Sequence, residues 1–116
     1  FEGYFNNRPN LYKQYKKIIN SLDKAEVSKK DSIALHLGGD SWDYPFLVMI
    51  KKKFKNKPPY VFHLKKEDIE KMGNTNFYPM YIIFENQFKN NLAQADIYYR
   101  VKDSSKDFTL LKKINQ

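Results

Sequence analysis

The stretch GGDSWDYP, residues 38–45, combines two acids, a serine and two aromatic rings between two glycines and a proline. The carboxylates of Asp40 and Asp43 can accept hydrogen bonds from hydroxyl groups. The rings of Trp42 and Tyr44 can stack on a sugar or a base. These four side chains are therefore the candidates for contact with a ligand or a partner.

The same stretch also has a purely structural interpretation. Gly38 and Gly39 let the backbone turn sharply out of a strand, one of them in a conformation that other residues resist. Asp40 or Ser41 can cap the helix that follows, and Pro45 suits its first turn, where the N–H group that proline lacks needs no partner. The two glycines and the proline are then a structural turn. The aromatic side chains either pack against the sheet or contact a ligand, and both possibilities stay open.

No catalytic constellation accompanies this stretch. It lacks the G-x-G-x-x-G and G-K-[ST] patterns, and two acids at a helix start would repel a phosphate. Two carboxylates are also too few for a hard cation. The chain has no cysteine and only two histidines, His36 and His63, which we expect to be hydrogen-bonded or partly buried within apolar runs. We predict no catalytic residue, no metal site and no cofactor.

Three short apolar runs are the candidate strands that position the motif. They cover residues 33–37, 60–64 and 80–84. The first run is apolar on both faces, which is typical of a central strand covered on both sides. We expect the three strands to be parallel, with the first between the other two. The motif then lies beyond the carboxyl end of the central strand, where ligands bind in such sheets.

Helical periodicity predicts the elements between these strands. Residues on one face of a first helix, from Pro9 to about Leu22, are Leu11, Tyr15, Ile18 and Leu22. A second helix is predicted over residues 45–54. A third, short helix is predicted over residues 67–72, with Gly73 just past its end. Residues 85–96 are polar and receive no assignment.

Two runs at the end of the chain, residues 97–102 and 108–113, predict an antiparallel hairpin. In the first run Ile97, Tyr99 and Val101 should share one face. The predicted fold class is α/β: a small three-layer sandwich whose mainly parallel central sheet, with three parallel strands, is extended by this C-terminal antiparallel hairpin. Residues 1–116 are expected to form a single domain and to be a fragment of a longer protein.

The chain carries a formal net charge of +8, almost all of it from lysine. A basic surface attracts nucleic acid, anionic lipid or acidic substrates. Heavy use of lysine, asparagine and isoleucine is also typical of AT-rich genomes. Nucleic acid is an unlikely partner because base recognition favours arginine, and the only arginines are Arg8 and Arg100. The lysines of residues 51–57 are expected to form a solvated helix end.

The order of four segments resembles a known family. These segments are YFNNRPNLYKQY, LHLGGDSWDYPFLVMI, PYVFHLK and FYPMYIIF. They are similar to the C-terminal soluble domain of bacterial multispanning membrane glycosyltransferases, in the dolichyl-phosphate-mannose protein mannosyltransferase superfamily that includes the aminoarabinose transferases. The family motif G-G-D-x-W-E-Y-P matches residues 38–45, with Asp43 in place of the commoner glutamate. The likeness is weak over the final hairpin.

The resemblance implies a function for the parent protein and a location for the domain. Enzymes of this superfamily use polyprenyl-phosphate sugar donors, and their catalytic acids lie in loops near the first membrane helices, outside this chain. The chain is then a non-catalytic accessory domain on the extracytoplasmic side of the bacterial cytoplasmic membrane. Its implied partners are the membrane-embedded part of the same chain, anionic lipid head groups or the acceptor. An independent ligand- or partner-binding module is the alternative.

Overall fold

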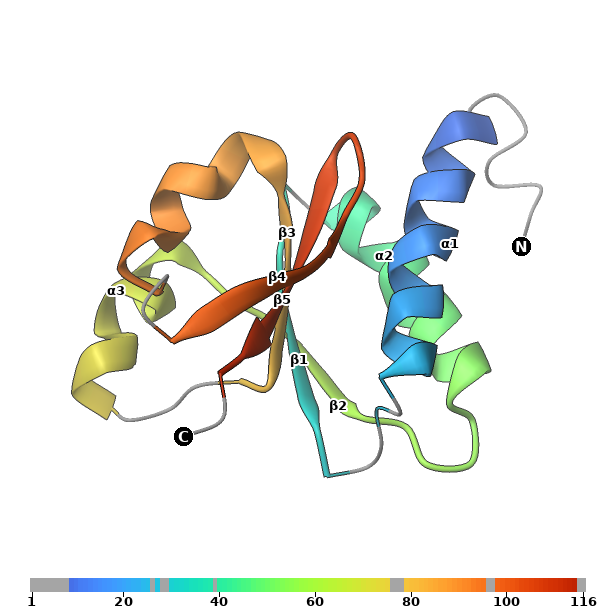
Figure 1. Cartoon of the computed structure of the whole chain (residues 1–116), viewed down its shortest axis with the longest axis horizontal. Helices are drawn as coiled ribbons and strands as arrows, with labels where there is room; N and C mark the ends of the chain where they lie inside the picture. The colour runs from blue at the N-terminus through green and yellow to red at the C-terminus, as the bar shows by residue number, and fades with distance from the viewer. Residues whose placement is uncertain are drawn as a thin grey trace.

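The structure is a computed structural model that describes residues 9–25, 27, 30–38, 40–75, 79–95 and 98–114. Within these residues lies a five-stranded mixed sheet in the order β2-β1-β3-β5-β4 (Figure 1). The strands are β1 (Ser32–His36), β2 (Tyr60–His63), β3 (Tyr81–Glu85), β4 (Tyr99–Ser104) and β5 (Phe108–Lys113). β1 pairs in parallel with both β2 and β3, which confirms the predicted parallel strands and the central position of the first. The β4–β5 hairpin joins β3 through an antiparallel pair.

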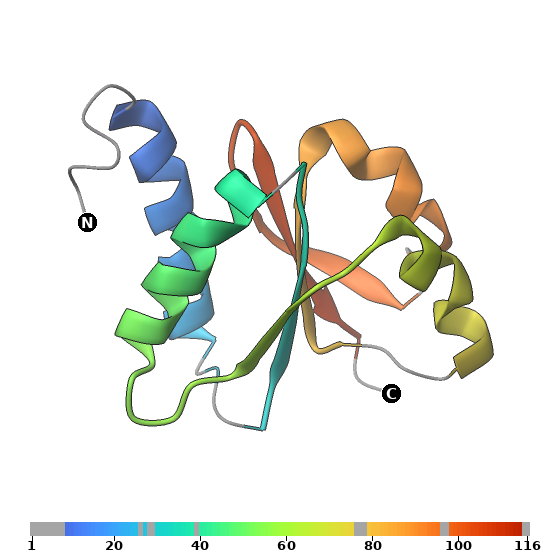
Figure 2. The ribbon, with the colours of Figure 1, turned by 180° about the vertical axis from the view of Figure 1, so that it is seen from behind.

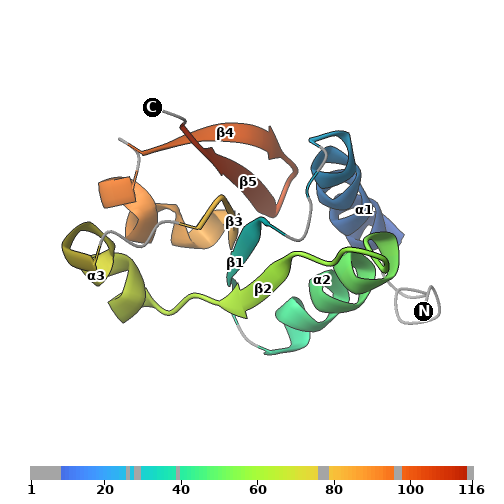
Figure 3. The same cartoon turned by 90° about the horizontal axis from the view of Figure 1, so that it is seen from below.

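Helices lie on both sides of this sheet (Figures 1 and 3). They are α1 (Pro9–Lys24), α2 (Asp40–Lys53), α3 (Lys66–Thr75) and the 3-10 helix η2 (Asn86–Ala95). α1 and α2 lie on one side, and α3 and η2 lie on the other. The mixed α/β class predicted from the sequence is therefore correct.

The larger core cluster lies between the sheet and the pair α1 and α2. Tyr15, Phe46 and Phe108 form its centre, with ring centroids 4.3 to 5.1 Å apart. Ile18 and Leu22 are also buried, which confirms the predicted apolar face of the first helix. Aromatic rings in such tilted or edge-on contacts stabilise a core beyond the area that they bury.

A second core cluster fills the space between the sheet and the pair α3 and η2. Ala34 and Ile82 extend into it from the middle of the sheet, and Ile69 and Leu92 cover them from the two helices. The burial of Ala34 on this side and of Ile33 on the other confirms that β1 is covered on both faces.

Two helices extend beyond their predicted bounds. α2 begins at Asp40, so Pro45 lies inside the helix, not in its first turn as predicted. Proline at this position cannot donate to the carbonyl of residue 41, and its ring crowds that carbonyl, which costs a helix about 3 kcal/mol. α3 continues to Thr75, so Gly73 lies within it and not past its end. One glycine costs a helix only about 1 kcal/mol, which the burial of Ile69 can offset.

The end of the chain also differs from the prediction in detail. Residues 86–95, left without an assignment, form η2, which has a kink at Phe88 and is anchored by buried Leu92. β4 has an irregular register between Val101 and Asp103. Tyr99 is buried, whereas Val101, which was predicted to share its face, is 65% exposed on β4, the edge strand of the sheet. Ile97 lies outside the described residues.

Candidate functional site

The carboxyl ends of β1 and β3 form the topological switch point of the sheet. The chain leaves β1 through α2 to reach β2 on one side, and returns through α3 to β3 on the other side. Crevices for ligands in α/β sheets occur where neighbouring connections diverge in this way. The motif of residues 38–45 starts here, since Gly38 follows β1 and α2 begins two residues later (Figure 2).

A buried carboxylate fixes the start of the motif. The backbone N–H of Gly38 donates a hydrogen bond to Oε1 of Glu85, and Nε2 of Gln87 donates one of 2.5 Å to Oε2. Glu85 is only 6% exposed, so these bonds replace the water that a carboxylate otherwise needs. A Cβ atom on Gly38 would lie 3.0 Å from Oε1 of Glu85.

Glycine is therefore favoured at position 38 by the limited space beside Glu85 and not by its backbone conformation. Its φ angle lies outside the left-handed region that favours glycine, so the unusual conformation predicted for one of the two glycines does not occur there. Gly39 lies outside the described residues, and the prediction is untested at that position. The sequence signal for Glu85 is an acid directly after the apolar run of the third strand, which our sequence analysis did not single out.

A second polar contact beside the motif holds His36, the last residue of β1. Nδ1 of His36 lies 2.8 Å from the carbonyl oxygen of Leu64, and Nδ2 of Asn91 lies 3.2 Å from Nε2. A carbonyl oxygen only accepts hydrogen bonds, so the contact with Leu64 is made by a protonated Nδ1, and the Asn91 amide nitrogen then donates to Nε2. The Phe88 ring packs edge-on against the imidazole, with centroids 5.4 Å apart.

This confirms the expectation that His36 is a buried, hydrogen-bonded histidine. His63, which was expected to be hydrogen-bonded or partly buried in the same way, has an exposed side chain. β2 is an edge strand, so its last residue is not covered as the last residue of β1 is.

The turn of the β4–β5 hairpin is fixed at the same end of the sheet (Figure 1). Nδ2 of Asn86 donates to the carbonyl oxygens of Ser105 and Lys106, at 3.1 and 2.9 Å. From α1, Nε2 of Gln14 donates to Oδ2 of Asp107 at 2.8 Å, and Oε1 of Gln14 accepts from the N–H of Asp107 at 2.6 Å. One helix, one strand end and one turn are thus held together beside the motif.

The candidate contact residues themselves are only partly described. The described part of the structure does not include the side chains of four residues of the motif, namely Asp40, Ser41, Trp42 and Asp43. The contact and capping roles predicted for them stay predictions, although their backbone forms the first turn of α2. Tyr44 is 51% exposed, whereas Pro45 and Phe46, the next two residues, are buried. The motif therefore presents at least one aromatic side chain to the outside.

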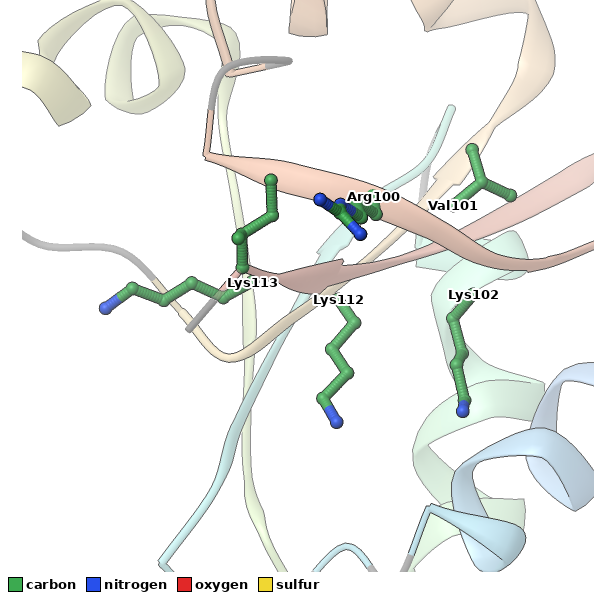
Figure 4. A pocket seen from close by; sticks show the side chains of 6 residues that line it. Arg100, Val101, Lys102, Lys112 and Lys113 are labelled. Carbon is green, nitrogen blue, oxygen red and sulfur yellow. The ribbon is translucent and has the colours of Figure 1, made fainter. Parts of the chain in front are cut away.

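The opposite end of the sheet carries a basic pocket that our sequence analysis missed. Its volume is about 430 Å³, and it is lined by Arg100, Val101, Lys102, Lys112, Lys113 and Ile114 (Figure 4). Its sequence signal is the pairing of two lysine-rich strands in the predicted hairpin. Nearby in β3, burial raises the pKa of Tyr81, and the Asp31 carboxylate raises it further.

The described residues contain neither a metal-binding cluster nor a membrane-spanning helix. No three His, Cys, Asp or Glu side chains in that part of the chain are grouped so that they could hold a metal ion. None of its helices is both long and apolar enough to cross a membrane.

Fold and site together define a mixed α/β protein whose switch point carries an aromatic, acidic motif. No protein-family model, curated protein or solved structure matches the chain.

Proposed function

We propose that residues 1–116 form a three-layer α/β sandwich that acts as a non-catalytic accessory domain of a polyprenyl-phosphate-sugar-dependent membrane glycosyltransferase. The domain lies on the extracytoplasmic side of the bacterial cytoplasmic membrane. Its motif, residues 38–45, contacts the membrane-embedded catalytic body or the acceptor. The observation that carries the proposal is the position of this motif at the switch point, with the Tyr44 ring exposed.

The hydrogen bonds at this edge support a contact role over a catalytic one. Both carboxylate oxygens of Glu85 accept hydrogen bonds from the protein, and both ring nitrogens of His36 have partners. A general acid or base needs a free position that faces the substrate. These groups instead hold β1, β3 and η2 in a fixed arrangement, which positions the first turn of α2.

Position at a switch point also favours a second candidate, an independent ligand-binding module. In that case the motif would bind a small polyhydroxylated molecule without any membrane-embedded partner. The two candidates differ in what the gene encodes: a long multispanning region next to these residues supports the first, and its absence supports the second.

The proposal is tested by sequencing the full reading frame and measuring sugar transfer. Membranes that contain the full-length protein should transfer sugar from a polyprenyl-phosphate donor, and the 116-residue chain alone should not. Removal of residues 1–116 should reduce transfer while the remaining protein still inserts in the membrane. A reading frame without membrane helices, or turnover by the isolated chain, would contradict the proposal.

A further inference from the structure

The β4–β5 hairpin places like charges directly opposite each other. Arg100 on β4 and Lys112 on β5 are cross-strand partners, and Lys102 lies two residues after Arg100. Like charges in directly opposed positions destabilise an antiparallel pair. We name the six residues that line the pocket of about 430 Å³, from Arg100 to Lys102 and from Lys112 to Ile114, the hairpin cationic surface.

The three cations, Arg100, Lys102 and Lys112, have no ion-pair partner among the described residues. The acid nearest to them along β4 is Asp103, whose Oδ1 lies 3.5 Å from Nζ of Lys17 on α1. Figure 4 shows Lys102 and Lys112 extending to the same side of the hairpin. The fold thus tolerates an electrostatic cost that an external anion would remove.

An exposed apolar side chain lies among these cations. Val101 is 65% exposed on the edge strand, between Arg100 and Lys102 in sequence. It extends to the other side of β4 from Lys102 (Figure 4), so a flat surface that meets this edge contacts apolar and cationic groups together. Surfaces that combine apolar side chains with lysines and arginines bind at the interface of anionic membranes. Base readout in nucleic acid relies instead on arginine forks, and this surface has one arginine.

We propose that the hairpin cationic surface binds the phosphate groups of anionic lipids in a bilayer. This inference rests on the proposed function only because that function brings the domain next to a membrane. Contact with lipid would place the start of β4 and the end of β5 against the bilayer, and the motif lies at the other end of the sheet. The motif would then meet an acceptor, or the part of the membrane-embedded body that projects from the bilayer.

The test is cosedimentation of the 116-residue chain with vesicles. One set contains phosphatidylcholine alone, and the other contains phosphatidylcholine with phosphatidylglycerol. The test variant carries Arg100→Gln, Lys102→Gln and Lys112→Gln. The matched control carries Lys51→Gln, Lys52→Gln and Lys55→Gln, three exposed lysines at the end of α2. Both variants lose three charges, so they differ only in which surface is neutralised.

The chain should bind the anionic vesicles more tightly than the neutral ones. Each cation near an anionic surface contributes about a fivefold gain in affinity. The affinity of the test variant for anionic vesicles should therefore fall about 100-fold. The affinity of the control variant should fall less than about fivefold. Because the test variant removes a like-charge pair, its midpoint of thermal unfolding should equal or exceed that of the unmodified chain.

Three results would overturn the inference. These are absence of binding to anionic vesicles, equal losses in the two variants, and tighter binding to a single-stranded oligonucleotide that the same three substitutions abolish. The last result would assign the surface to nucleic acid. The vesicle assay contains no sugar donor, so its failure leaves the glycosyltransferase proposal standing. Failure of the transfer assay likewise leaves the lipid result standing.

Discussion

The backbone N–H of Gly38, at the end of β1, donates a hydrogen bond to Oε1 of Glu85, at the end of β3. Two neighbouring parallel strands are thereby joined where they reach the switch point. Alanine normally stabilises a protein when it replaces a glycine of ordinary conformation. Here Gly38→Ala should destabilise by about 1–3 kcal/mol, because its Cβ would lie 3.0 Å from a buried carboxylate that is held at both oxygens.

The control for this substitution is the same change in a Glu85→Ala background. Without the carboxylate the new Cβ has room, so the cost of Gly38→Ala should largely disappear. Urea unfolding of the unmodified chain, the two single variants and the double variant gives the coupling free energy, which should exceed about 0.5 kcal/mol. Additive effects of the two substitutions would show that the Cβ of alanine at position 38 does not crowd the Glu85 carboxylate.

The arrangement around His36 predicts a single tautomer. Nitrogen-15 chemical shifts of the imidazole at neutral pH should show a protonated Nδ1 and an unprotonated Nε2, because Nδ1 faces a carbonyl oxygen. A His36→Gln variant, which lacks this ring, identifies which imidazole signals belong to His36. An unprotonated Nδ1 on His36 would contradict the described contacts.

The sequence predicts the elements of the central sheet well because each depends on a local pattern. β1 and β3 are apolar on both faces, and Tyr15, Ile18 and Leu22 recur at helical spacing. The contacts at the motif are harder to predict because they join distant residues. Gln14 and Asp107 are 93 positions apart, and Gly38 and Glu85 are 47 apart. No periodicity indicates which glutamate or glutamine faces a given backbone group.

Helix propensities also predict helix bounds wrongly where the burial of neighbouring side chains stabilises a longer helix. Gly73 and Pro45 are helix-ending residues by propensity, yet both lie within helices. Phe46 and Ile50 are buried on α2, and Ile69 on α3. Burial of such side chains contributes roughly 1.5–3 kcal/mol each, which equals or exceeds the cost of one glycine and approaches that of one proline.

Gln14 on α1 should be required for the stability of the hairpin turn. Gln14→Ala removes the donor to the Asp107 carboxylate and the acceptor of the Asp107 backbone N–H, which is left without this partner. The free energy of unfolding should fall by about 1–3 kcal/mol. Asn20→Ala, at an exposed position of the same helix, is the control and should change it by less than about 0.5 kcal/mol. Equal effects would mean that the turn is not held through Gln14.

Tyr81 should make the fold sensitive to alkaline pH. Burial and the Asp31 carboxylate raise its pKa above the ordinary value of 10.0, so the folded state holds the phenolic proton more tightly than the unfolded state. The resulting stability is complete below pH 10.0 and is lost as the pH rises through the folded pKa. Between about pH 9 and pH 11.5, the free energy of urea unfolding should fall less in the Tyr81→Phe variant than in the unmodified chain. Parallel pH profiles would contradict this prediction.

The central claim is that the motif at the switch point contacts the rest of a membrane glycosyltransferase or its acceptor. The most direct measurement compares sugar transfer by the full-length protein with Tyr44→Ala and with Tyr60→Ala. Both tyrosines are exposed, but Tyr44 lies in the motif and Tyr60 lies at the other end of the sheet. Tyr44→Ala should lower transfer at least about tenfold, a loss of roughly 1.4 kcal/mol in contact energy. Tyr60→Ala should leave transfer within about twofold of the unmodified protein, and thermal unfolding should show that both variant domains are folded. Transfer that is unchanged by Tyr44→Ala, or lowered equally by both substitutions, would contradict the claim.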